Sequence, residues 1–78
     1  MTKIEMRETL QDVRDCTTDP MMRVALSLAI SLVTSRLTRL RAEWLVTMLR
    51  DISYDCDCRG EAAYAGLLRR VALAVYAG

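Results

Sequence analysis

Apolar residues in the middle of the chain recur at alternating spacings of four and three. They are Leu26, Ile30, Val33, Leu37, Leu40 and Trp44. This is the a/d spacing by which one helix presents a continuous apolar seam to a partner. No glycine or proline lies between Pro20 and Gly60 to interrupt it. The pattern predicts one long central helix over about residues 20–53, whose seam is hard to cover within a single chain of this length.

The preceding residues carry the signature of a shorter, capped helix. Thr2 and Glu5 stand three residues apart, which is the spacing of a capping box. One narrow apolar stripe then continues to about residue 16. Asp19 followed by Pro20 favours a new helix start, because the aspartate caps it and the proline has no N–H to leave unpaired. We therefore expect a first helix over about 3–16, followed by the central helix.

A second connection is expected over residues 51–58, where Asp55 or Asp57 would cap a last helix over about 58–76. That helix is rich in alanine and has an apolar line of its own, formed by Tyr64, Leu68, Val71 and Val75. The sequence thus predicts an all-α fold with three helices and a long central helix. We expect residues 1–78 to form a single helical domain that self-associates.

The alternative is a compact four-helix bundle with a turn near residues 34–38, where Thr38 would cap an additional helix. The unbroken a/d phase argues against this turn, because a loop usually resets the phase. Arg36, Arg39 and Arg41 argue against it too, since they would crowd the positive N-terminus of the new helix. The long central helix is therefore the favoured architecture.

Composition and charge agree with a small helical protein that needs a partner. Hydrophobic residues make up 53% of the chain, yet aromatic residues are only 5%, so Leu, Val, Ala and Met supply the core. A chain of 78 residues buries a limited share of its surface and is marginal in stability when alone. The net charge of +1 does not suggest wholesale nucleic-acid binding. Because the middle of the chain is basic and both flanks are acidic, we expect the flanks to fold onto the middle.

The basic residues gather in one part of the chain. We expect them to contact an acidic partner or phosphates, or to pair with the acidic first helix. A nucleic-acid-associated regulator that uses an arginine face in a dimer is the alternative function, although more charge would be expected for it. The four residues are Arg36, Arg39, Arg41 and Arg50.

Candidate chemistry along the chain is sparse. Asp55 and Asp57 with Gly60 resemble part of a calcium loop, but Gly66 stands where the bidentate glutamate is needed. The chain has three cysteines and no histidine, which is a poor set of zinc ligands. No nucleophile has an activating base, and no glycine-rich loop would hold a phosphate. We expect no enzyme activity, no metal site, no cofactor and no small-molecule substrate.

These observations favour a protein-interaction module: an adaptor, a chaperone-like subunit or a stoichiometric inhibitor. We expect a homodimer or a complex with another protein. The charged N-terminus is unlike a signal peptide, and the apolar run over residues 24–33 is short for a membrane span, so a cytoplasmic location is expected. The expected interface is the exposed seam, namely Leu26, Ile30, Val33, Leu37, Leu40, Trp44 and Met48.

Overall fold

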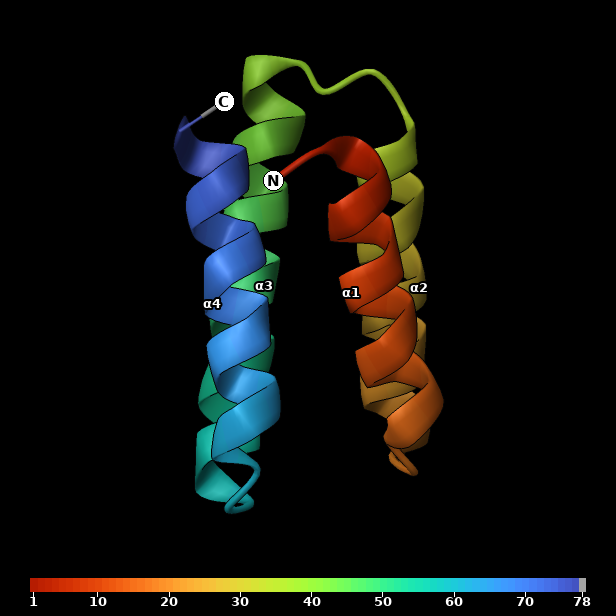
Figure 1. Ribbon diagram of the computed structural model, residues 1–78, viewed down its shortest axis with the longest axis vertical. Helices are drawn as coiled ribbons and strands as arrows, with labels where there is room; N and C mark the ends of the chain where they lie inside the picture. The colour runs from red at the N-terminus through yellow and green to blue at the C-terminus, as the bar shows by residue number, and fades with distance from the viewer. Residues whose placement is uncertain (78) are drawn as a thin grey trace.

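Four helices run alternately up and down in the computed structural model, which describes residues 1–77 (Figure 1). They are α1 (Lys3–Cys16), α2 (Pro20–Thr34), α3 (Arg39–Cys58) and α4 (Ala62–Ala77). The first two form one hairpin and the last two form another, and α2 packs against α3 while α1 packs against α4. The all-α fold is confirmed, and its arrangement is the compact four-helix alternative.

The first two helices begin where the local sequence predicts. The Glu5 N–H donates to Thr2 Oγ1 and the Thr2 N–H donates to Glu5 Oε1, each over 3.1 Å, which completes the capping box. The hydrogen bond from the Thr2 backbone also lowers the pKa of the Glu5 carboxyl. At the start of α2, the Met21 N–H donates to Asp19 Oδ1 over 2.9 Å, and Pro20 occupies the first helical position.

The long central helix over residues 20–53 is wrong, because the chain reverses at residues 35–38. The Thr38 side chain caps α3 by accepting from the Arg41 N–H over 3.3 Å. The reversal buries Val33 and Leu45 in one core, which a continuous helix would prevent. The four-residue connection also preserves the spacing of four and three, so the periodicity gave no sign of it.

The arginines beside this reversal do not prevent it. A cation at a helix N-terminus costs about 0.3–1 kcal/mol when exposed. The Arg39 side chain is almost fully exposed, and its Nε lies 3.6 Å from Glu43 Oε1 one turn later. Burial of a leucine side chain contributes about 1.5–3 kcal/mol, so the core contacts of α3 outweigh this unfavourable placement.

The second connection also lies later than expected. Residues 51–58 are helical and belong to α3, and α4 begins at Ala62 rather than near residue 58. Gly60 has φ +77°, a left-handed conformation that glycine adopts at little cost. The Gly60 N–H donates to Asp57 O over 3.1 Å and the Glu61 N–H donates to Cys56 O over 2.8 Å. This is a Schellman motif, and it ends α3 at the first glycine after the proline.

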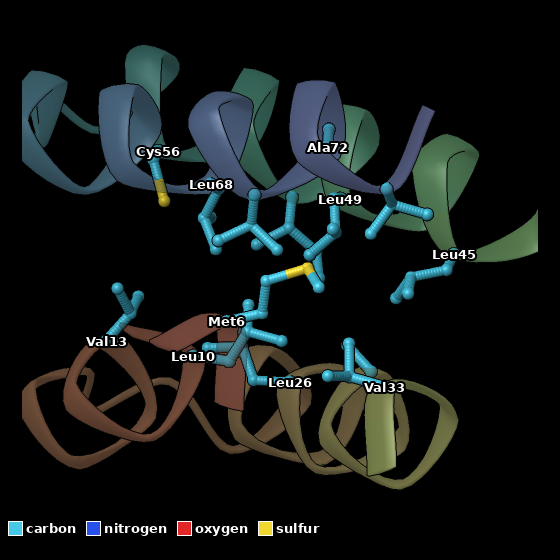
Figure 2. Packing of buried hydrophobic residues seen from close by; sticks show 14 of the residues in the cluster. Met6, Leu10, Val13, Leu26, Val33, Leu45, Leu49, Cys56, Leu68 and Ala72 are labelled. Carbon is cyan, nitrogen blue, oxygen red and sulfur yellow. The ribbon is translucent and has the colours of Figure 1, made fainter. Parts of the chain in front are cut away.

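The core lies between the two hairpins and receives side chains from all four helices (Figure 2). Met6, Leu10 and Val13 from α1 are buried against residues of the second hairpin. The remaining core residues labelled in Figure 2 are Leu26, Val33, Leu45, Leu49, Cys56, Leu68 and Ala72. Because each helix gives one stripe to this core, its opposite side faces outward.

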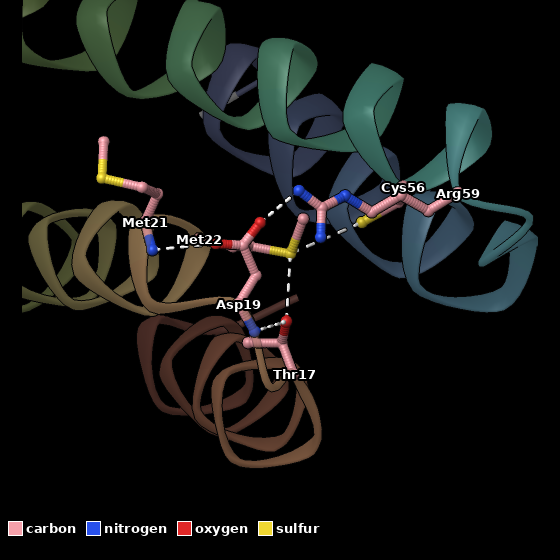
Figure 3. Close-up of polar contacts among 6 residues, drawn as sticks. All are labelled: Thr17, Asp19, Met21, Met22, Cys56 and Arg59. Carbon is pink, nitrogen blue, oxygen red and sulfur yellow. Dashed lines mark hydrogen bonds and ion pairs between the residues drawn. The ribbon is translucent and has the colours of Figure 1, made fainter.

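At the end of the bundle where α2 begins and α3 ends, polar and sulfur contacts join the two hairpins (Figure 3). Asp19 forms an ion pair with Arg59, and the buried Cys56 thiol donates to Met22 Sδ over 4.0 Å. The Thr17 hydroxyl donates to the same sulfur over 3.4 Å. Burial raises the pKa of Cys56, so the thiol keeps the proton that it donates.

Replacement of Gly60 and of Gly66 by alanine should have opposite effects on the free energy of unfolding. Gly60→Ala should lower the free energy of unfolding by about 1–2 kcal/mol, because alanine is strained at positive φ. Gly66→Ala, inside α4, should raise it by up to about 1 kcal/mol through helix propensity. A Cβ at either position meets no atom within 4 Å, so packing does not complicate the comparison. Urea unfolding measures both; equal effects would contradict the α3–α4 turn.

Replacement of Asp19 separates its capping role from its ion pair. Partial burial raises the pKa of this carboxyl, but hydrogen bonds from the Met21 N–H and Arg59 outweigh it and lower the pKa overall. The stability that Asp19 adds is therefore present at neutral pH and is lost as the pH falls through its lowered pKa. Asp19→Asn retains a cap and should lower the melting temperature less than Asp19→Ala.

Thermal unfolding followed from pH 7 to pH 3 measures both effects. The wild type should lose more stability than Asp19→Asn over this range, because asparagine does not titrate. An identical pH dependence of the two proteins would show that the Asp19–Arg59 pair contributes nothing.

Candidate protein-binding face

Two neighbouring helices carry large apolar side chains on their outward sides. On α3, Leu40 is 64% exposed and Trp44 is 66% exposed, and Met48 one turn later is half-buried. On α2, Val24 is 61% exposed and Leu28 is 54% exposed. We call these five residues the α2–α3 face.

The orientation of the α3 part follows from its neighbours. Ala42 and Val46 line a groove together with residues of α4, so this side of α3 faces α4. Trp44 and Met48 lie on the other side of the buried Leu45. They therefore point toward α2 and to the outside of the bundle.

The α2 part lies on the same side of the molecule. In Figure 1, α1 lies in front of α2 and α4 lies in front of α3. Ala29 is buried and therefore points into the core. Because α2 is a right-handed helix, Val24 and Leu28 then lie on its side away from α1. By the same reasoning, Trp44 lies on the side of α3 that faces away from α4. Since α2 packs against α3, the two exposed stripes are adjacent and form one surface.

The structure divides the predicted seam into two parts. Leu26 and Val33 are completely buried in the core between the hairpins, and Ile30 is half-buried. Leu40 and Trp44 are exposed. The reversal at residues 35–38 causes this division, because it turns the second half of the seam outward. The half-buried members of the second half are Leu37 and Met48.

The predicted basic cluster is divided as well. The Arg41 side chain donates through Nη1 to the Arg36 backbone oxygen over 3.3 Å, so these residues stay together at the α2–α3 connection. Arg39 pairs with Glu43. Arg50 lies nine positions after Arg41 on α3, so the four arginines do not form one continuous face.

A groove of about 980 Å³ opens beside this connection, at the end of the bundle where α1 begins and α4 ends. Met6, Leu37 and Val46 are among its apolar lining residues, and Arg36 and Arg39 also line it. A shallower hollow of about 360 Å³ runs along the outward side of α2, beside Val24 and Leu28. The arginines thus border an apolar recess, whereas the outward side of α2 is nearly free of charge.

The cysteines do not assemble a metal site. Cys16 and Cys58 are exposed, Cys56 is buried, and all three are free thiols. Within residues 1–77, no group of three or more cysteine and carboxylate side chains is placed to hold a metal ion. The neighbouring Cys16 thiol raises the pKa of the Tyr64 phenol on α4.

Val24 and Leu28 are the members of the face that sequence reasoning missed. Neither residue belongs to the a/d seam, so the seam gave no reason to place them on a binding face. In a four-helix bundle, α2 has only two neighbours and cannot bury its whole circumference. Ser27 and Ser31, which line the hollow beside them, were the available signal for the outward side.

Comparisons with protein-family models, curated proteins and solved structures found no match to this chain. Among residues 1–77, no helix has the length and apolar character needed to cross a membrane. The α2–α3 face is therefore interpreted from its own chemistry.

Proposed function

We propose that the protein is a small protein–protein interaction module, acting as an adaptor, chaperone-like subunit or stoichiometric inhibitor through its α2–α3 face. The observation that carries the proposal is the exposure of Trp44, the one tryptophan of the chain, one turn after the exposed Leu40 on α3. Tryptophan is enriched among the residues that dominate interface energies. Contiguous exposed apolar side chains are uncommon on monomers and mark surfaces that a partner covers.

The free energy gained by burying these apolar side chains supports the same interpretation. Burial of one large apolar side chain contributes about 1.5–3 kcal/mol, so four exposed members of the face offer several kcal/mol before the costs of association. Ser27 and Ser31 lie beside Val24 and Leu28 and would let a partner helix approach α2 closely. The regulator alternative depends on an arginine face, and the separation of Arg50 from the other arginines makes the apolar face the better-supported site.

Substitution of the face should remove the complex without unfolding the protein. Leu40→Ser combined with Trp44→Ser changes exposed side chains, so the free energy of unfolding should stay within about 1 kcal/mol of the wild type. In gently prepared extracts of the host cell, the tagged wild type should migrate as a complex larger than one chain. The double variant should migrate as a monomer of 8.8 kDa plus its tag.

Leu73→Ser is the matched control, because Leu73 is 68% exposed but lies on α4 outside the α2–α3 face. This variant should keep the mass of the wild-type complex. A wild type that migrates as a monomer in the host extract would overturn the proposal, as would a double variant that stays in the complex.

A further inference from the structure

We propose that a second copy of this chain covers the α2–α3 face, with α3 of each copy running antiparallel to α3 of the other. This inference rests on the proposed function, because it uses the same face, and it adds the identity and direction of the partner. The order of charged and apolar residues along the outward side of α3 favours this arrangement.

One outward stripe of α3 changes its chemistry from end to end. Arg41 gives the stripe a positive start, Trp44 and Met48 give it an apolar centre, and Asp51 and Asp55 give it a negative end. The five positions follow at spacings of three and four, which keeps them on one side of the helix: Arg41, Trp44, Met48, Asp51 and Asp55.

The stripe is complementary to itself when it is turned end to end. Two antiparallel helices bring together positions that are equally far from a common centre. About the level of residue 46, Arg41 meets Asp51 of the second copy, and Trp44 meets Met48 of the second copy. A parallel arrangement would instead place Arg41 against Arg41 and Asp51 against Asp51, which repels at both ends.

Within residues 1–77, the charges of this stripe have no ion-pair partner. The four ion pairs found in residues 1–77 are Arg14–Asp15, Arg39–Glu43, Arg59–Asp19 and Arg69–Asp57. Arg41, Asp51 and Asp55 take part in none of them. All three are exposed, so they are available to a second molecule.

The same charges are also unfavourable for α3 itself. Arg41 lies in the first turn, where the helix dipole is positive, and Asp55 lies in the last turn, where it is negative. The opposite placement would stabilise an isolated α3. An antiparallel second copy offsets this cost, because it brings an acidic helix end to Arg41 and a basic helix end to Asp55.

Only the last turn of α2 joins this contact. The Asp19–Arg59 pair and the Met22–Cys56 contact fix the level of α2 against the antiparallel α3, and they place the centre at residue 46 beside the C-terminal turn of α2. About that centre, the two α2 helices overlap only at these turns, and Val24 and Leu28 face the α2–α3 connection of the second copy. Arg23 is the only charged residue of α2, so α2 adds little like-charge repulsion.

Exchange of the two charges tests the direction of pairing in the purified protein. Equilibrium sedimentation should give the wild type a mass near twice 8.8 kDa. Arg41→Asp and Asp51→Arg should each weaken self-association by about tenfold or more, since each puts like charges in contact. The double variant, with both substitutions in one chain, should recover the wild-type affinity, and an equimolar mixture of the two single variants should form a heterodimer.

Arg50→Asp is the control, because it makes the same charge change on α3 outside the stripe and should leave the affinity unchanged. If circular dichroism shows that a single variant does not fold, cysteine cross-linking replaces the charge exchange. One chain then carries Arg41→Cys and a second chain carries Asp51→Cys, and both also carry Cys16→Ser and Cys58→Ser. When mixed and oxidised, they should cross-link to each other and not to themselves.

Several outcomes would overturn the inference. A monomeric wild type at concentrations of about 100 µM excludes the second copy, while a large complex in host extracts would leave the proposed function intact. The antiparallel arrangement is excluded if the charge exchange does not change the affinity of the dimer. It is also excluded if the Arg41→Cys chains cross-link to themselves. A monomer in both the pure state and the extract would remove the proposed function as well.

Discussion

The reversal of the chain at residues 35–38 is the constraint on which the rest of the structure depends. It brings α3 back along α2, so that Val33 and Leu45 share one core. It also turns Leu40 and Trp44 outward, since they follow the reversal on the side that α4 does not cover. The Thr38 cap makes the reversal inexpensive by satisfying one of the N–H groups that open α3.

The two ends of the bundle are held differently. At one end, the Asp19–Arg59 pair and the contact between Met22 and Cys56 join the hairpins directly. At the other end, the groove beside Leu37 separates the start of α1 from α3 and α4. The α2–α3 face runs between these ends on helices whose opposite sides are buried in the core.

Local signals predicted the parts of this fold that depend on neighbouring residues. The caps at Thr2 and Asp19 were predicted correctly, because a cap is decided within about one turn of helix. The reversal was not, because Thr38 competes with a continuous helix and burial against residues far along the chain decides the outcome. For the same reason, Leu26 and Trp44 share one periodic pattern in the sequence, although one is buried and the other exposed.

The composition of α2 carries the functional interpretation one step further. Each helix of this bundle packs against two neighbours, so part of every circumference faces outward. On the outward side of α1 the chain places charged residues such as Glu8 and Asp12, which keep that side solvated. On the outward side of α2 it places Val24 and Leu28, and a charged residue at either position would be as compatible with the core. The core does not require apolar residues at these two positions. Their presence is best explained by a surface that a partner covers when the protein acts.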